Sequence, residues 1–126
     1  MAFLPKKCQQ YLAKRGFAYE QLEEGAQKAI ILRGVKLPEG KYDSAQADIL
    51  IMLPPSYPDC APDMFYAMPW LRLATTKSYP RAADYPIAFT GLQWQRWSRH
   101  NSEWRSGVDG IWTMIKRIEE ALEVAA

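Results

Sequence analysis

The sequence predicts an α+β domain in which two helices pack on one face of an antiparallel sheet. Three patterns support this fold class: a short amphipathic segment near the N-terminus, several apolar runs separated by turn residues, and a long aliphatic stripe at helical spacing near the C-terminus. The 126 residues suffice for a single domain, residues 1–126, and a composition of 48% hydrophobic and 24% charged residues is typical of a folded protein.

A short helix and a hairpin are expected first. Pro5 suits the first turn of a helix, and Gly16 suits its end. Four residues in this segment are spaced so that they lie on one face of a helix: Leu4, Cys8, Tyr11 and Leu12. Residues 17–23 and 28–35 then form two segments with alternating or β-branched apolar residues, and the turn formers at 24–26 predict that they pair as antiparallel strands.

Two further strands complete a predicted four-stranded meander. Residues 48–53 contain the run ILIML, which is typical of a buried strand. The following segment, LPPSYPDCAPDMFY, is rich in prolines, which exclude a central strand because proline lacks the backbone donor. We therefore expect a stiff turn over residues 54–63 and a short strand over residues 64–67.

The rest of the chain is predicted as a long irregular segment and a helix. Residues 68–103 show no sustained period; such long loops are usually functional or disordered, and their aromatic content argues against disorder. Ser106 and Asp109 resemble a capping start of the final helix. This helix carries an aliphatic stripe formed by Val108, Ile111, Ile115, Ile118 and Leu122. The opposite side is expected to face solvent and carries Lys116, Arg117, Glu120 and Glu123.

Composition excludes several classes of function. A formal net charge of +2, from 16 basic and 14 acidic residues, favours neither nucleic acid nor an anionic membrane as a partner. No apolar run approaches the roughly 20 residues that span a bilayer, so a cytoplasmic location is expected. With one histidine, no CxxC pair and no phosphate-cradling glycine loop, we expect neither a metal nor a cofactor. Cys8 and Cys60 are expected to be reduced, buried thiols.

The most unusual stretch is QWQRWSRHNSEWR, residues 93–105, which holds three of the five tryptophans and the only histidine. Tryptophans near a helix start most often anchor an irregular segment by burying a large area, and we expect this of Trp97 and Trp104. Interleaved basic and aromatic residues also occur in surfaces that bind proteins and in surfaces that bind single-stranded nucleic acid. The balanced charge of the chain disfavours nucleic acid as the partner. The candidate binding residues are Arg96, Trp97, Arg99, Trp104 and Arg105.

Three segments resemble a known family: YPDCAPDMFY, FTGLQWQRWSRHNSEWR and GVDGIWTMIKRIEEAL. Together with the helix and the meander, they are similar to the ubiquitin-conjugating enzyme (UBC) superfamily, and specifically to its bacterial branch, the prokaryotic family E. The resemblance covers nearly the whole chain. It implies a UBC-like sandwich that lacks the later helices of the eukaryotic fold.

The resemblance also implies a function. Members of the superfamily accept a ubiquitin-like modifier from an activating enzyme and transfer its C-terminal carboxylate to an amine. The expected partners are therefore the activating enzyme and the modifier protein. Related bacterial systems have been linked to defence against phage, so the resemblance implies a ubiquitination-like, antiphage pathway.

The cysteine that carries the modifier in eukaryotic members has no counterpart here. That cysteine lies a little before the tryptophan that precedes the second helix, whereas residues 94–104 of this chain contain no cysteine. Cys8 and Cys60 lie elsewhere. Two interpretations stay open: the domain is a catalytically silent scaffold that binds the modifier or the activating enzyme, or another side chain carries the acyl group.

For the second interpretation, Ser98 and His100 form the leading pair, and Ser102 and Cys60 are alternative carriers. A serine hydroxyl needs a neighbouring base to become a nucleophile. In an extended segment, residues two apart point to the same side, so Ser98 and His100 can both lie on one face of the segment. The acyl intermediate would be an oxyester.

Nearby polar residues are expected to assist this chemistry. Stabilisation of the developing oxyanion is expected from Asn101, Arg96 and Arg99. Asp84 or Glu103 could orient the histidine. The arginines of the stretch, including Arg105, could meet the modifier's tail. A serine hydrolase is disfavoured because the chain has no GxSxG motif.

Overall fold

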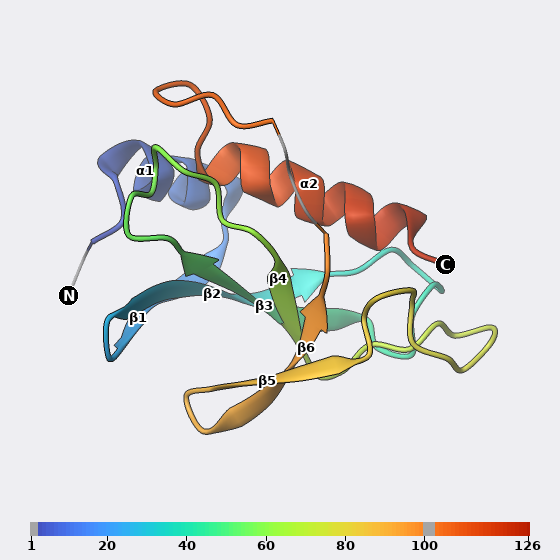
Figure 1. Cartoon of the computed structure of the whole chain (residues 1–126). Coiled ribbons are helices and arrows are strands. Elements are labelled where there is room, and N and C mark those ends of the chain that lie inside the picture. The colour runs from blue at the N-terminus through green and yellow to red at the C-terminus, as the bar shows by residue number, and fades with distance from the viewer. Residues whose placement is uncertain (1–2, 100–102) are drawn as a thin grey trace.

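The computed structural model describes residues 3–99 and 103–126. Over these residues the chain forms two helices and six strands (Figure 1), and their arrangement confirms the predicted α+β class. The elements are α1 (Lys6–Arg15), β1 (Ala18–Glu24), β2 (Gln27–Lys36), β3 (Gln46–Leu53), β4 (Phe65–Met68), β5 (Tyr85–Phe89), β6 (Leu92–Trp97) and α2 (Ile111–Val124). The first helix, the first four strands and the final helix lie close to their predicted positions.

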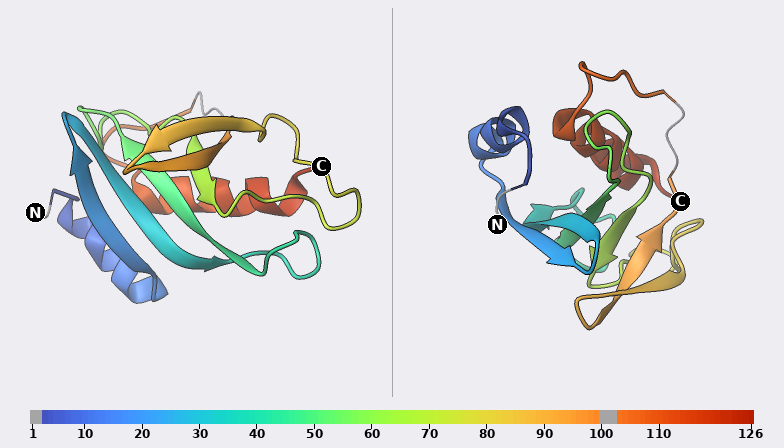
Figure 2. Two further views of the ribbon diagram at one scale, coloured as in Figure 1. Left: turned by 90° about the horizontal axis from the view of Figure 1, so that it is seen from below. Right: turned by 60° about the vertical axis from the view of Figure 1, so that its left-hand side comes forward.

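An antiparallel sheet runs through the molecule, and both helices lie on the same side of it (Figure 2). The strand order is β1-β2-β3-β4-β6-β5, so β1 and β5 form the two edges. Although β5 comes before β6 in the chain, β6 is the strand that pairs with β4. Residues 69–84 therefore cross from β4 to the far edge of the sheet before the chain returns beside β4.

The predicted four-stranded meander is confirmed as β1 to β4, but the long irregular segment predicted after it is wrong, because residues 85–97 form the β5–β6 hairpin and extend the sheet to six strands. Pro86 disfavours a strand when only the sequence is considered, but it lies in the edge strand, where a missing backbone donor is tolerated. The hairpin turns at Thr90 and Gly91, whose φ angles are 51° and 76°. Most of β5 is exposed, so this segment has no apolar alternation that would mark it as a strand.

The main core lies between the helices and the sheet. Ile49 of β3 is fully buried in it, as are alternate residues of the neighbouring strands. Trp97, at the end of β6, stacks on Phe65 with 5.3 Å between the ring centroids and meets Tyr42 edge-on at 6.1 Å. The Tyr42 hydroxyl donates a hydrogen bond to Leu122 O at 2.6 Å. This aromatic cluster therefore joins β4 and β6 to the end of α2.

The C-terminal helix begins later than predicted, at Ile111, with Gly110 before it. Val108 is 54% exposed and lies outside the aliphatic stripe, which corrects its predicted place in the core. At the helix start, Thr113 Oγ1 accepts a hydrogen bond from Gly110 N at 3.3 Å and donates one to Asp109 Oδ1 at 3.0 Å. The other four residues of the predicted stripe are confirmed as buried: Ile111, Ile115, Ile118 and Leu122. Met114, which was not predicted, is buried beside them. Within residues 3–99 and 103–126, neither helix is long and apolar enough to cross a membrane.

A buried glutamine, Gln95 of β6, fixes the segment that crosses to β5. The side chain is completely buried, and its Nε2 donates to Leu71 O at 3.0 Å and to Ala83 O at 2.7 Å. Its Oε1 accepts from Leu71 N at 2.8 Å and from Trp97 Nε1 at 3.1 Å. One amide thus satisfies the backbone N and O of Leu71 at one end of the crossing segment and the backbone O of Ala83 at the other.

Replacement of this amide should destabilise the whole fold. Gln95→Leu should lower the free energy of unfolding by about 3 kcal/mol or more, because two donors and two acceptors lose their partners in a dry core. Urea denaturation measures this change. Gln93→Leu is the matched control, since Gln93 lies on the same strand and is exposed; its effect should stay below about 0.5 kcal/mol. Equally small effects in both variants would contradict the role assigned to Gln95.

Candidate functional site

Ser98 follows directly after β6, where the chain leaves the sheet for the loop that leads to α2. It is half-buried, and its backbone N donates to Ala82 O at 3.0 Å. The backbone N of the next residue, Arg99, donates to Trp97 O at 3.0 Å. These two backbone hydrogen bonds therefore hold the predicted carrier residue, Ser98, at the end of β6.

The other residues of the predicted catalytic group lie outside the described residues. These are His100 and Asn101, together with the alternative carrier Ser102. The pairing of Ser98 with His100 therefore stays a prediction, and so does the role of Asn101.

The loop between β6 and α2 is tied to the proline-rich turn between β3 and β4. Trp104 donates its Nε1–H to Pro58 O at 2.9 Å, and its ring centroid lies 6.4 Å from that of Tyr57. Ser106 Oγ donates to Asp59 Oδ1 at 2.8 Å, so this serine bonds across to the turn instead of capping α2 as predicted. Two segments that are far apart in the sequence are thus joined side by side.

Both tryptophans that were predicted to anchor the loop do so. Trp97 has no exposed surface, so it offers nothing to a partner in this structure. Trp104 is half-buried and is held by its hydrogen bond to the turn. The large rings therefore fix both ends of the loop.

Cys60 lies on the same proline-rich turn and is exposed, so the prediction of a buried thiol there is wrong. The turn extends beyond the sheet because its prolines cannot join a central ladder, and the backbone N of Cys60 donates to Ser56 O within the turn at 3.4 Å. Cys8, on α1, is buried as predicted, and its Sγ lies 3.1 Å from Tyr57 Oη. Both cysteines are free thiols.

Two of the three arginines in the QWQRWSRHNSEWR stretch contact other side chains at the surface. Arg96 lies over the ring of Tyr85, 4.3 Å from its centroid. Arg105 forms an ion pair with Asp109 at 3.2 Å, and its backbone N also donates to that carboxylate at 2.7 Å. The positive charge of Arg105 is therefore already compensated within the chain, whereas Arg96 makes a cation–π contact with a neutral ring.

The third arginine, Arg99, is half-buried and lies over Trp97, 5.1 Å from the ring centroid. Burial lowers the pKa of its guanidinium, and the nearby charge of Arg81 acts in the same direction. An arginine with a less favourable environment for its charge gains from an added anion. Arg99 is therefore the cation of the stretch that is best placed to attract one.

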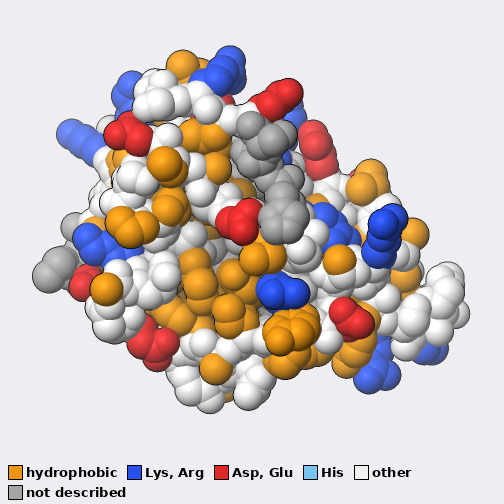
Figure 3. Space-filling model, in the orientation of Figure 1, with side chains coloured by type: hydrophobic (Ala, Val, Ile, Leu, Met, Phe, Trp, Pro, Cys, Tyr) orange, Lys and Arg blue, Asp and Glu red, His pale blue; other side chains and the backbone are white. Residues whose placement is uncertain are grey.

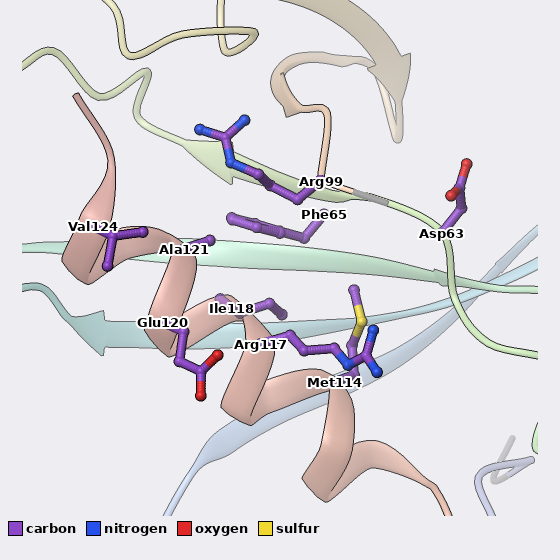
Figure 4. A pocket seen from close by; sticks show the side chains of 9 residues that line it. All are labelled: Asp63, Phe65, Arg99, Met114, Arg117, Ile118, Glu120, Ala121 and Val124. Carbon is purple, nitrogen blue, oxygen red and sulfur yellow. The ribbon is translucent and has the colours of Figure 1, made fainter. Parts of the chain in front are cut away.

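A cavity of about 240 Å³ opens beside Arg99, between the sheet and α2 (Figure 4). Its lining residues are Asp63, Phe65, Arg99, Met114, Arg117, Ile118, Glu120, Ala121 and Val124. Figure 4 shows Arg99 and Arg117 on opposite sides of an apolar floor that includes Phe65. Arg117 also donates to Glu103 O at 2.8 Å, which holds the loop against α2. Three residues of the predicted solvated face of α2 are exposed as expected: Lys116, Glu120 and Glu123. Arg117 alone is half-buried, and no local signal in α2 distinguishes it.

The described part of this site offers side-chain nucleophiles and cations. The Ser98 hydroxyl lies at the end of the sheet, the Cys60 thiol lies on the adjoining turn, and Arg99 and Arg117 flank the cavity. Within the described ranges, no three histidine, cysteine, aspartate or glutamate side chains are grouped so that they could hold a metal ion. A hydroxyl or a thiol can act as a nucleophile when a neighbouring base activates it.

The fold and the site define the class of the protein. An N-terminal helix, an antiparallel sheet, a proline-rich turn after β3, a tryptophan-anchored loop and one C-terminal helix make a reduced ubiquitin-conjugating fold. The family model described as "Prokaryotic E2 family E" matches residues 4–125, and the chain therefore belongs to this family of E2-like prokaryotic proteins. The match confirms the resemblance seen in the sequence. Comparisons with curated proteins and with solved structures gave no match.

Asp109, where the loop meets α2, should make the stability of the fold sensitive to acid. Hydrogen bonds from the side chain and the backbone of Arg105 lower the pKa of Asp109 from 3.8 to about 2, and the Thr113 hydroxyl adds to this effect. Because the pKa is lower in the folded state, the stabilisation is complete above pH about 4 and is lost as the pH falls towards about 2.

In Asp109→Asn, the unfolding temperature should therefore fall less steeply over this acid range than it does in the wild type. Circular dichroism melts at a series of pH values measure the two profiles. Identical slopes for wild type and variant would show that Asp109 is not the group responsible.

Proposed function

We propose that this E2-like chain is an acyl carrier that accepts a ubiquitin-like modifier from an activating enzyme on Ser98 and passes it to an amine. The observation that carries the proposal is the position of Ser98, half-buried at the end of β6, in the loop that leads to α2. By resemblance to the superfamily, this loop is where the acyl-carrying residue belongs. Family membership supports the two partners in general terms, namely the activating enzyme and the modifier.

In the charging step, His100 accepts the proton of the Ser98 hydroxyl while the oxygen attacks the thioester carbonyl on the activating enzyme. A C–O bond forms, the C–S bond breaks, and the proton passes to the departing thiolate, so atoms and charge balance. In the transfer step, an amine attacks the oxyester carbonyl. The Ser98 oxygen leaves and takes up a proton that the amine releases through His100.

The transfer step needs stabilisation of the oxyanion, because an oxyester reacts with amines more slowly than a thioester does. Asn101 and Arg99 are assigned to this task. Arg99 is supported by its place directly after Ser98 and by its half-buried guanidinium, which gains from a nearby negative charge. The cavity between Arg99 and Arg117 is assigned to the C-terminal tail of the modifier, which must reach Ser98 in an extended form.

As part of the same proposal, the pathway is a bacterial ubiquitination-like one that serves defence against phage. This part rests on the resemblance of the chain to its family and on no residue of the site.

Two alternative functions have specific observations in their favour. The exposed thiol of Cys60, on the turn joined to the loop, favours a thioester carrier. The absence of cysteine from residues 94–104 favours a catalytically silent scaffold that binds the modifier or the activating enzyme. We favour Ser98 because it lies in the loop itself, and the chemical lability of a charged adduct separates all three functions.

Incubation with the activating enzyme, the modifier and ATP should give a covalent adduct that survives thiol reductant and is lost in alkali. Ser98→Ala should abolish this adduct, since no hydroxyl is left to form the ester, and His100→Ala should slow its formation by roughly 100-fold or more. Gel shift and intact-mass measurement detect the adduct. Ser56→Ala, at an exposed serine of the proline-rich turn, is the matched control and should charge normally.

Three results would contradict the Ser98 assignment. An alkali-labile adduct that persists in Ser98→Ala moves the carrier to another hydroxyl, and Ser102→Ala then tests the alternative. A thiol-labile adduct that disappears in Cys60→Ser makes Cys60 the carrier. If no adduct forms under conditions that charge the activating enzyme, the chain is a catalytically silent scaffold.

A further inference from the structure

The cavity beside Arg99 has an apolar floor and charged walls. Its volume of about 240 Å³ lies below the roughly 300 Å³ at which pockets for whole small ligands begin, so it suits one side chain of a longer ligand. The floor consists of Phe65 of β4 and of Met114, Ile118 and Ala121 of α2, all of which are buried. In the space-filling view, Lys and Arg side chains and apolar side chains lie side by side where the end of β6 approaches α2 (Figure 3).

Arg117 forms one wall of this cavity, and its positive charge has no counter-ion. The side chain is half-buried, and its Nη2 donates to the backbone O of Glu103 at 2.8 Å. Within residues 3–99 and 103–126, no carboxylate forms an ion pair with Arg117. A guanidinium has several N–H donors, so it can bind a carboxylate and keep the bond to Glu103. A half-buried cation of this kind is stabilised by an added anion.

The opposite wall, at Arg99, is also positively charged. Nη1 of Arg99 donates to the backbone O of Ser98 at 3.2 Å, which again is a neutral acceptor. Burial is the main cause that lowers the pKa of Arg99, and the charge of Arg81 lowers it further. Arg81 precedes Ala82, whose carbonyl accepts the hydrogen bond from Ser98 N. Two chain segments therefore bring positive charge to the end of the cavity where Ser98 lies.

Two carboxylates line the cavity as well, and neither neutralises these arginines. Asp63 already has an interaction within the chain, and among the described residues it forms no ion pair with Arg99 or Arg117. Glu120 is exposed, and Figure 4 shows its side chain directed away from Arg99. Water and salt screen an exposed charge more than a half-buried one. The cavity therefore favours an anion.

We propose that this cavity selects the tail of the modifier by its side chains: an aliphatic residue lies on the floor, and an acidic residue beside it pairs with Arg117. The inference rests on the proposed acyl-carrier function and names the class of modifier that Ser98 accepts. Arg99, which directly follows Ser98, then faces the reacting end of the tail, in agreement with its assigned role at the oxyanion. A basic residue at the same place in the tail would bring like charges together, so such a tail is rejected.

Three N-acetylated hexapeptides test this preference. Each has a central leucine and ends in two glycines with a free carboxylate, and they differ only in the residue beside the leucine, which is glutamate, glutamine or lysine. The glutamate peptide should bind roughly tenfold more tightly than the glutamine peptide, and the lysine peptide should bind least tightly. NMR titration measures the affinities, and the methyl signals of Met114 and Ile118 report whether the peptide occupies the floor of the cavity.

Variants of Arg117 separate recognition from damage to the fold. Arg117→Glu should reverse the order, so that the lysine peptide binds best, and an unfolded chain cannot produce such a reversal. Arg117→Lys keeps the charge and should keep the original order. Lys116→Glu, an equal charge reversal at the neighbouring exposed position of α2, is the matched control and should leave the order unchanged. Arg99→Gln should weaken all three peptides by a similar factor, because each presents the same terminal carboxylate.

Several results would overturn the inference. Equal affinities for the three peptides would do so, as would no binding at millimolar concentration or binding that leaves the floor methyl signals unchanged. A preference for glutamate that persists in Arg117→Glu would show that another residue reads the tail. If a short single-stranded oligonucleotide shifts the methyl signals at lower concentration than the glutamate peptide does, the cavity serves nucleic acid and the inference is wrong.

Failure of this inference can be distinguished from failure of the proposed function. Ser98→Ala should bind the glutamate peptide as tightly as the wild type does, because peptide binding needs no hydroxyl. If the order of the peptides holds while the wild type forms no adduct, the carrier function fails and the cavity only binds the tail. If the adduct forms on Ser98 while the lysine peptide binds as tightly as the glutamate peptide, this inference fails alone.

Discussion

The buried amide of Gln95 is the interaction on which the rest of the structure depends. It holds Leu71 and Ala83, at the two ends of the segment that crosses the sheet, against β6, and it also accepts the indole N–H of Trp97. Because the crossing segment is fixed, β5 can pair on the outer side of β6, and β6 can pair with β4. The position of Ser98, at the end of β6, therefore follows from a hydrogen-bonded polar group inside an otherwise apolar core.

The sequence predicts an element correctly where the burial of that element leaves a pattern in its own residues. The apolar runs of β2 and β3 can be detected because both faces of these strands are buried, which leaves no polar residue in the middle of the run. The stripe of α2 can be detected because one face of the helix is buried. The β5–β6 hairpin could not be detected, because Pro86 is tolerated only through its place at the sheet edge, which depends on strands far away. Gln95 gave no signal either, since its partners lie 12 and 24 residues away and a glutamine among QWQRW resembles a surface residue.

In the candidate site, too, some features could be predicted from the sequence and others could not. Trp97 and Trp104 could be assigned as anchors because large rings near a helix start have few other uses in a small domain. The exposure of Cys60 could not be foreseen, because it results from the proline-rich turn extending beyond the sheet to meet Trp104 and Ser106. The cavity beside Arg99 depends on the packing of α2 against the sheet, so Arg117 could be assigned to it only from the structure.

The β5–β6 hairpin, which was not predicted from the sequence, affects which positions of the chain can tolerate substitution. By supplying Phe89 and Trp94 to a second apolar cluster, on the sheet face turned away from the helices, it gives the sheet packed side chains on both faces. β4 is the strand most affected: Phe65 and Ala67 pack beneath the helices, and Tyr66 packs on the other side. A strand of four residues with two packed faces has almost no position at which a polar substitution is neutral. Within this family, the segment around β4 should therefore tolerate less change than either edge strand, for reasons of packing that are separate from any chemistry at Ser98.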